Sequence, residues 1–261
     1  MVHRIPRLIP LVILIACASC VSSDKHAPQP RLPRRVLFIG SDDTADNGGI
    51  PNALNHLSRG ALDCSACAPE GKSLAWHWTQ GSALQVLHGD RWDDVVLQDD
   101  NDQILQKPHM FELFVHRFSE EIGRIGARTI LYVTWPPQDR PNIAPAIFHA
   151  YEEVSARAAA AVAPVGVAWR RSLKERPNLA LYQQDKIHPT PAGTYLAACV
   201  FYKTLLDRTP VGLPSFVTDA KGNAVITLPP ADAKYLQELA DKTVIEEHAP
   251  NDPDLEGMFG K

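Results

Sequence analysis

Asp185 and His188 have the residue types and the spacing of a hydrolytic acid–base pair. They lie three positions apart in the segment D-K-I-H-P, directly before a predicted helix that starts at Thr190. A carboxylate at this spacing can accept the Nδ1–H of the imidazole, which selects the tautomer whose Nε2 is free to take a proton. The spacing is therefore typical of a general base with its orienting acid.

Acidic side chains also follow two predicted strands. Asp42 and Asp43 come after the first strand, and Asp99, Asp100 and Asp102 come after the second. If these strands are neighbours, the carboxylates converge, and such oxygen-rich groups suit Mg²⁺ or Ca²⁺. The alternative is that the acids point into water and cap helices or turns.

Positioning these residues requires a fold in which strands and helices alternate. Short runs rich in β-branched residues predict strands at Arg35–Gly40, Asp94–Gln98, Arg128–Thr134 and Pro164–Ala168. Apolar residues at helical spacing predict helices at Ile50–Arg59, Gln80–His88, Pro108–Ile125, Ala144–Val162, Thr190–Leu206 and Ala231–Glu247, the last one after a hairpin around Lys221-Gly222-Asn223. This alternation indicates an α/β fold with a parallel sheet covered on both faces, in which ligands bind beyond the carboxyl ends of the strands.

Several segments, taken together, resemble those of the SGNH (GDSL-like) hydrolase superfamily. The stretch D-K-I-H-P-T-P-A-G-T-Y-L-A-A-C-V-F-Y resembles its last block, where an Asp and a His precede Pro and a helix. V-L-F-I-G resembles the nucleophile strand, E-G-K-S-L-A-W-H-W the second block and W-D-D-V-V-L-Q the third. T-I-L-Y-V-T-W-P and A-P-V-G-V-A-W are similar to segments of a bacterial envelope subgroup. We expect a hydrolase domain over residues 35–206, and a C-terminal extension over residues 207–261 whose hairpin and helix pack on the domain.

The resemblance implies a three-layer, flavodoxin-like fold with a parallel sheet of roughly five strands. It implies hydrolysis of acyl esters, in which a serine attacks the carbonyl, His188 takes the proton and Asp185 orients His188. This chemistry needs no metal or other cofactor. The resemblance also implies that the Gly71 backbone N–H and the Asn101 side chain donate hydrogen bonds to the oxyanion.

The first block departs from the superfamily at the nucleophile. The strand ends in F-I-G-S-D-D-T, which places Asp42 where the superfamily has serine and Ser41 one position earlier. An offset of one residue turns a side chain at a strand end to the other face, so Ser41 could act only if the loop were rearranged. A carboxylate at Asp42 near His188 would pair with the imidazolium and keep it protonated.

These residues leave more than one function open. The first is an esterase for acyl or carbohydrate esters that uses Ser41 after local rearrangement, or Asp42 in an altered mechanism. The second is a catalytically inactive relative that keeps the pocket and binds a glycan or acyl ligand. The divalent-cation site at the strand ends is the third.

Charge and composition narrow the partners. The 261 residues include 26 Lys and Arg against 30 Asp and Glu, which gives a formal net charge of −4. Without a basic surplus to contact phosphates, the sequence argues against a nucleic-acid partner. A small-molecule ester or glycan is the expected ligand.

The N-terminus has the features of an export signal. Arg4 and Arg7 precede an apolar run over residues 8–16, which is too short to span a bilayer as a helix. The run ends in L-I-A-C, which resembles a bacterial lipoprotein cleavage box and implies a signal peptide over residues 1–16 and lipidation of Cys17, with Cys20 as a second candidate. An ordinary secretory signal and a retained anchor are the alternatives. We expect residues 17–34 to form a tether, with the domain lipid-anchored in the bacterial envelope, facing the periplasm, or secreted.

Cys64 and Cys67, in the motif C-S-A-C, predict a local disulfide in an exported protein. A structural zinc site would need four ligands, and no second pair of Cys or His lies nearby at a suitable spacing. A redox role for the pair is the alternative.

Overall fold

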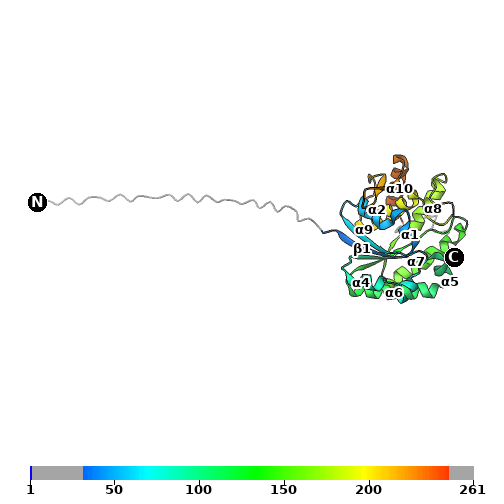
Figure 1. Cartoon of the computed structure of the whole chain (residues 1–261), viewed down its shortest axis with the longest axis horizontal. Coiled ribbons are helices and arrows are strands. Elements are labelled where there is room, and N and C mark those ends of the chain that lie inside the picture. The colour runs from blue at the N-terminus through cyan, green and yellow to red at the C-terminus, as the bar shows by residue number, and fades with distance from the viewer. Residues whose placement is uncertain (2–31, 247–261) are drawn as a thin grey trace. The chain divides into compact units, whose positions relative to one another are not determined.

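A parallel sheet of five strands forms the centre of the fold (Figure 1). The strands are β1 (Arg34–Ile39), β2 (Leu62–Cys67), β3 (Asp94–Leu97), β4 (Arg128–Tyr132) and β5 (Ala161–Ala163), in the order β2-β1-β3-β4-β5. All four neighbouring pairs are parallel. This order is that of flavodoxin-like folds, so the predicted fold class is confirmed.

The computed structural model describes residue 1 and residues 32–246, without the side chains of residues 244–246. The chain divides into two units, Met1–Arg31 and Leu32–Lys261, and all described helices and strands belong to the second. The predicted signal peptide, most of the predicted tether, and both candidate lipidation sites, Cys17 and Cys20, lie outside the described residues.

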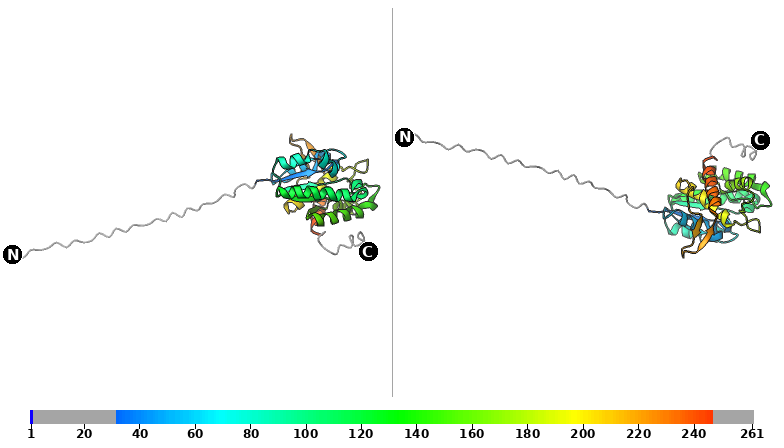
Figure 2. Two further views of the ribbon diagram at one scale, coloured as in Figure 1. Left: turned by 90° about the horizontal axis from the view of Figure 1, so that it is seen from below. Right: turned by 90° about the horizontal axis from the view of Figure 1, so that it is seen from above.

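Helices cover both faces of the sheet and make three layers. One face carries α2 (Ile50–Leu57), α8 (Val165–Glu175), α9 (Pro191–Leu206) and α10 (Pro230–Glu246). The other carries α3 (Leu74–Thr79), α4 (Ala83–Gly89), α5 (Asn101–Gln106), α6 (Pro108–Arg124) and α7 (Ala144–Ala158). Figure 2 shows the green helices α6 and α7 on one side and the red helix α10 on the other.

The alternation of side chains along the buried strands creates two hydrophobic cores. In β1, Val36 and Phe38 belong to the core under α2 and α9, whereas Leu37 and Ile39 belong to the core under α6 and α7. Both faces of a parallel strand are covered by helices, so a continuous apolar run is stable there. These cores hold the carboxyl ends of β1 and β3, from which the site residues extend, in a fixed arrangement.

Residues after α9 add to the same core. The hairpin of β6 (Phe216–Thr218) and β7 (Ala224–Thr227) and helix α10 supply buried apolar side chains to the α9 face, among them Val217, Ile226, Leu236 and Leu239. Helix α9 therefore lies between the sheet and α10, and most of its residues are buried on all sides. The described part of the C-terminal extension is packed against the domain.

Two edge strands differ from the sequence prediction: β2, for which no strand was predicted, and β5. A strand was expected at Pro164–Ala168, but the chain forms β5 at Ala161–Ala163 and enters helix α8 at Val165. A short apolar run does not distinguish a buried strand from the buried face of a helix. Close packing also requires Gly166 in this helix, because a Cβ there would lie 2.1 Å from the carbonyl oxygen of Thr134.

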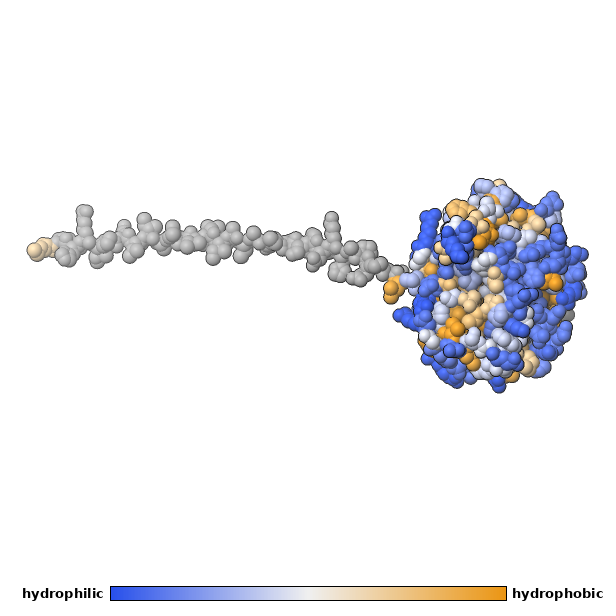
Figure 3. All heavy atoms as spheres, viewed as in Figure 1, coloured by the Kyte–Doolittle hydropathy of each residue, from blue (hydrophilic) through white to orange (hydrophobic). Residues whose placement is uncertain are grey.

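The surface of the described unit is mostly polar on the face seen in Figure 3, where apolar side chains are scattered in small groups. None of the described helices is long and apolar enough to span a membrane.

Candidate active site

The loop after β1 is held from two sides. The buried His77, in α3, donates its Nε2–H to the carbonyl of Gly40 over 2.7 Å. Gln98, just after β3, accepts the backbone N–H of Ser41 over 2.6 Å. Gly40 allows this approach, because a Cβ at that position would lie 2.4 Å from the Gln98 amide oxygen. The start of α1 (Asp42–Ala45) is thereby fixed against both neighbouring elements.

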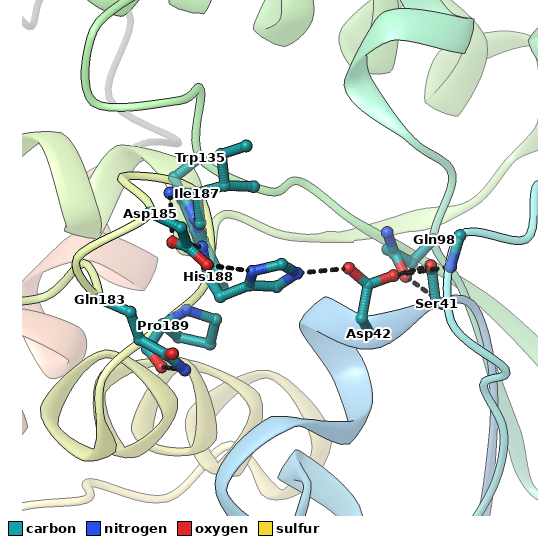
Figure 4. Close-up of polar contacts among 10 residues, drawn as sticks. Ser41, Asp42, Gln98, Trp135, Gln183, Asp185, Ile187, His188 and Pro189 are labelled. Carbon is teal, nitrogen blue, oxygen red and sulfur yellow. Dashed lines mark hydrogen bonds and ion pairs between the residues drawn. The ribbon is translucent and has the colours of Figure 1, made fainter.

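The Asp42 carboxylate points toward the imidazole of His188 (Figure 4) and also accepts the backbone N–H of Gly71. Its Oδ2 is 2.8 Å from His188 Nε2, and its Oδ1 accepts the Gly71 N–H over 3.0 Å and the Ser41 hydroxyl. Burial alone would raise the pKa of Asp42, but the hydrogen bonds from Gly71, Ser41 and His188 outweigh burial and lower the pKa to about 2. Asp42 is therefore an ionised carboxylate in the place where a nucleophilic serine was expected.

His188 is held between two carboxylates. Its Nδ1 is 2.6 Å from Asp185 Oδ2, and its Nε2 contacts Asp42 on the other side (Figure 4). The hydrogen bond to Asp185 raises the pKa of His188 to about 9, since it outweighs partial burial and is supported by the bond to Asp42. Because both ring nitrogens carry protons at neutral pH, this imidazolium cannot act as a general base.

The His188 loop is ordered by its own backbone and by the aromatic core. Asp185 Oδ1 accepts the N–H groups of Ile187 and His188 over 2.9 and 3.0 Å, which turns the imidazole back onto Asp185. The indole of Trp135 is 2% exposed and donates to the Ile187 carbonyl over 3.0 Å. Thr190 caps the N-terminus of α9 through the N–H of Gly193. The hydrogen bond predicted between Asp185 and His188 Nδ1 is therefore present, but Nε2 is not free, because it contacts Asp42.

Ser41 is buried and turned away from the imidazole. Ser41 is only 4% exposed, and its hydroxyl donates a hydrogen bond to the Asp42 carboxylate. Among the described residues, no hydrogen bond joins Ser41 to His188. The rearranged loop that would make Ser41 a nucleophile is therefore not present, in agreement with the one-residue offset from the expected serine.

The two predicted oxyanion donors have different positions. The Gly71 N–H points into the site, where it already donates a hydrogen bond to Asp42. Asn101 does not: its amide nitrogen donates to the Trp135 carbonyl over 2.8 Å, and its amide oxygen accepts the Thr134 hydroxyl over 2.9 Å. Asn101 is the first residue of α5, and its side chain holds the segment after β4 rather than pointing at Asp42.

The predicted disulfide between Cys64 and Cys67 is wrong, and both thiols are free. The two residues are three positions apart in the extended strand β2, so their side chains lie on opposite faces of the sheet and pack against different cores. Three strand residues also separate the Cα atoms by roughly 10 Å, whereas a bridge requires less than about 7 Å.

The acidic residues at the strand ends do not converge on a common point. Asp99 is 3% exposed and accepts the N–H groups of Leu74 and Asp100. Asp100 caps α5, and Asp102 pairs with Arg140 over 3.0 Å. Within residues 32–246, no group of three or more His, Cys, Asp or Glu side chains is arranged to hold a metal ion. The carboxylates act as caps and ion-pair partners.

Burial raises the pKa of two of these acids. Asp99 has a pKa of about 7, because burial outweighs its two backbone hydrogen bonds. Asp43 has a pKa of about 8, because burial and the neighbouring charge of Asp42 both favour its neutral form. Both pKa values lie close to neutral pH.

A cavity of about 370 Å³ opens in front of the Asp42–His188 pair. The residues that line it are Asp42, Ala45, Asp46, Ala68, Glu70, Gln183 and His188. Its lining is polar and acidic with two small apolar side chains, and its size is in the range of sites for small molecules.

The sequence motifs did not single out Gln98 or Asn47 as site residues. Gln98 directly follows β3, and β3 is next to β1 in the sheet, so the strand order could have placed Gln98 beside the loop after β1. Asn47 gave no signal, because its partners are 142 and 147 residues away in the sequence.

The fold and the site geometry can be compared with known proteins. No protein-family model matches the chain, and no curated protein matches it. Among solved structures, a candidate SGNH hydrolase from Slackia heliotrinireducens is similar, with 27% identity, a TM-score of 0.58, and coverage of 66% of this chain and 99% of its own. A DUF4886 family protein from Bacteroides uniformis has 14% identity, a TM-score of 0.63, and coverage of 85% of this chain and 99% of its own. The acetyl xylan esterase AlAXEase has 12% identity, a TM-score of 0.55, and coverage of 65% of this chain and 98% of its own.

These similarities and the strand order define the class of the protein. By its fold, the chain belongs to the SGNH-like superfamily, whose members among its structural neighbours are hydrolases and esterases. At the position where the sequence resemblance predicts the nucleophilic serine, this chain has Asp42.

Proposed function

We propose that this SGNH-like domain binds a small glycan or acyl ligand in the cavity at Asp42 and His188, and does not hydrolyse esters by the serine mechanism. The observation that carries this proposal is the Asp42 carboxylate, which bridges His188 Nε2 and the Gly71 N–H. In this proposal, one side chain takes the positions of both the nucleophile and the substrate oxyanion.

Three requirements of the serine mechanism are absent from this arrangement. Among the described side chains, no hydroxyl is hydrogen-bonded to His188, and the hydroxyl of Ser41 is bonded to Asp42 instead. The imidazole is protonated and cannot accept a proton, since its pKa is about 9. The Gly71 donor is already satisfied by a carboxylate, which a neutral ester carbonyl would have to displace.

The cavity lining supports a hydroxyl-rich ligand. Gln183, Asp46 and Glu70 offer amide and carboxylate groups that can accept hydrogen bonds from sugar hydroxyls, while Ala45 and Ala68 leave space for small apolar groups. One structural neighbour is an acetyl xylan esterase, which supports an acylated carbohydrate as the ligand class.

The experiment compares the wild type with Asp42→Ser and Asp42→Asn on p-nitrophenyl acetate. We expect no turnover from the wild type or from Asp42→Asn, which keeps the shape of the side chain without a nucleophile. Asp42→Ser should gain activity by restoring a hydroxyl beside His188, and Asp42→Ser with His188→Ala should lose that activity. Wild-type turnover that disappears in Ser41→Ala would refute the proposal.

The binding half is tested by calorimetry with xylo-oligosaccharides that carry or lack acetyl groups. We expect heat of binding from the wild type and weaker binding from Gln183→Ala, whose side chain lines the cavity. The absence of heat with both ligand sets would contradict a carbohydrate ligand, whatever the outcome of the esterase assay.

A second candidate function is ester hydrolysis with Asp42 as the nucleophile. It is favoured by the ionised state of Asp42 at the nucleophile position. Attack by the carboxylate would expel the alcohol and leave an acyl–aspartyl anhydride, which water must then split into the acid and free Asp42. A single turnover in ¹⁸O-labelled water with label found in Asp42 would support this candidate. Because water can attack either carbonyl of the anhydride, the decisive variant is Asp42→Asn, and turnover that persists in Asp42→Asn would exclude the candidate.

We also propose that the domain is carried in the bacterial envelope by a lipid on Cys17. The apolar run over residues 8–16 and the L-I-A-C motif support this. Incorporation of a labelled fatty acid should be lost in Cys17→Ala and kept in Cys20→Ala. The reverse pattern would move the lipid to Cys20, and incorporation in neither protein would contradict lipidation.

A further inference from the structure

Asn47 connects the two loops that carry Asp42 and His188. It is the middle residue of the short 3-10 helix η1 (Asp46–Gly48), which follows α1. Its amide nitrogen donates to the Pro189 carbonyl over 2.8 Å and to the Thr194 hydroxyl over 2.9 Å. Pro189 directly follows His188, and Thr194 is in the first turn of α9.

The residue type at position 47 matches two separate requirements. The backbone is left-handed, with φ 53° and ψ 41°, a conformation that asparagine tolerates better than most other residues. The side-chain amide has two N–H donors, and the two hydrogen bonds use both. An aspartate would accept the same backbone, but its carboxylate would face the Pro189 carbonyl oxygen without a proton between them.

The hydrogen bonds of Asn47 lie beside the ion pair of Asp42 and His188. In the part of the chain that the structure describes, the other hydrogen bond between residues 40–49 and residues 183–194 is the contact of Asp42 with His188. The Pro189 carbonyl also accepts a hydrogen bond from Gln183 Nε2 over 3.0 Å. Asn47 therefore bonds to a carbonyl that is already held within the His188 loop. Movement of η1 would therefore be transmitted to the ring of His188.

We infer that Asn47 is a positioning residue, which holds the His188 loop at the distance at which Nε2 contacts the Asp42 carboxylate. Asn47 itself does not line the cavity. The inference rests on the geometry of the loops and holds whether the domain binds its ligand or hydrolyses it.

The C-terminal hairpin also contacts η1. A Cβ at Gly48, the next residue after Asn47, would lie 3.2 Å from a methyl group of Val225 in β7. The hairpin therefore packs directly against η1. This contact gives the extension beyond residue 206 a part in the geometry of the site.

The test uses Asn47→Gly, which keeps the left-handed backbone and removes the side chain, and Asn47→Asp, which replaces the donors by acceptors. The pKa of His188 is measured by NMR titration of its ring Cε1–H. We expect it to fall in Asn47→Gly as the Asp42 contact lengthens, by less than the fall of about 1 expected when Asp42 loses its charge. In Asn47→Asp the added carboxylate acts in the opposite direction, so the pKa should be higher there than in Asn47→Gly. An unchanged pKa in folded Asn47→Gly would overturn the inference.

Two controls separate positioning from a general loss of stability. Asn55→Ala removes another asparagine that makes two backbone hydrogen bonds, to the N–H and carbonyl of Cys64, far from the His188 loop. It should lower the resistance to urea without moving the His188 pKa. In an Asp42→Asn background, Asn47→Gly should no longer shift this pKa, and an equal shift there would show that Asn47 does not act through Asp42.

If Asp42→Ser proves to be an esterase, Asn47→Gly in that background should lower kcat more than it changes KM. This second readout depends on the proposed function, whereas the NMR titration of the wild-type background does not. The failure of one can therefore be distinguished from the failure of the other.

Discussion

Replacing Asp42 by asparagine removes one of the two negative charges that hold the His188 proton. Asparagine keeps the size of the side chain, and its amide oxygen can still accept the Gly71 and Ser41 hydrogen bonds. The Nε2–H of His188, however, no longer faces a carboxylate. We therefore expect the pKa of His188 to fall from about 9 towards its ordinary value of 6.5.

The size of this fall can be worked from the site. The difference between about 9 and 6.5 corresponds to roughly 3 kcal/mol of preference for the protonated ring. Asp185 contributes the largest part, and solvent reaches the site, since 29% of the His188 side chain is exposed. After this screening, we assign about 1 kcal/mol to Asp42, or a fall in the His188 pKa of about 1.

The assay is an NMR titration of the His188 ring in the wild type and in three variants. Asp185→Asn should lower the pKa most, Asp42→Asn less, and Asp46→Asn least, since the Asp46 carboxylate acts on His188 through charge without a hydrogen bond. A wild-type pKa near 6.5, or a pKa that Asp42→Asn leaves unchanged, would refute the ion-pair interpretation.

The same pair gives a pH signature in stability. The His188 pKa is raised, so its contribution to the free energy of unfolding is complete below about 6.5 and is lost as the pH rises through about 9. The Asp42 pKa is lowered, so its contribution is complete above about 3.8 and is lost as the pH falls towards 2. The stability difference between the wild type and Asp42→Asn, measured by urea unfolding, should therefore be largest between about pH 4 and 6.5. A difference that grows above pH 9 would contradict this account.

Three further predictions concern the support of the site. Gln98→Ala should cost about 1–3 kcal/mol in urea unfolding, because it leaves the buried N–H of Ser41 without its acceptor; an unchanged urea midpoint would be inconsistent with this role. Because the pKa of Asp99 is raised, its contribution to the free energy of unfolding is complete below about pH 3.8 and is lost as the pH rises through about 7. Between pH 5 and 8, Asp99→Asn should therefore lose less stability than the wild type. Parallel curves of unfolding free energy against pH for the two proteins would show that Asp99 does not titrate in this range. Gly166→Ala should destabilise the fold by about 1–3 kcal/mol or more through a backbone clash, whereas Gly123→Ala, in open space on α6, should be neutral or stabilising in the same thermal melts.

The elements that the sequence predicted well are those with strong local patterns. β1, β3 and β4 are short apolar runs covered on both faces, and the apolar spacing of α6 identifies it within one residue at its C-terminal end. β2 was missed because an edge strand in which apolar and polar residues mix does not have this pattern. β5 was misplaced because the apolar residues after Pro164 pack as a helix face.

In the candidate site, too, the contacts that are local in the sequence were predicted better than those between distant segments. The Asp185–His188 pair is local in sequence, and its spacing alone indicated a hydrogen bond that the structure contains. The position of Asp42 opposite His188 joins residues 146 apart, and only the resemblance to a family suggested it. The directions of Asn101 and of Cys64 and Cys67 depend on which face of an element each residue occupies, and for these residues the sequence predictions were wrong.

The residues themselves determined the layered α/β architecture, the acid–base pair in the last loop, and the absence of a serine at the expected nucleophile position. The apolar pattern of a strand or helix and the three-residue spacing of Asp185 and His188 are properties of short segments. They can therefore be identified from the sequence before the tertiary structure is known. Only the tertiary structure decided that Asp42 accepts the Gly71 N–H, that His188 lies between two carboxylates that raise its pKa, and that Asn47 connects the two loops. These outcomes depend on distances of about 3 Å between segments that meet only when the sheet is assembled.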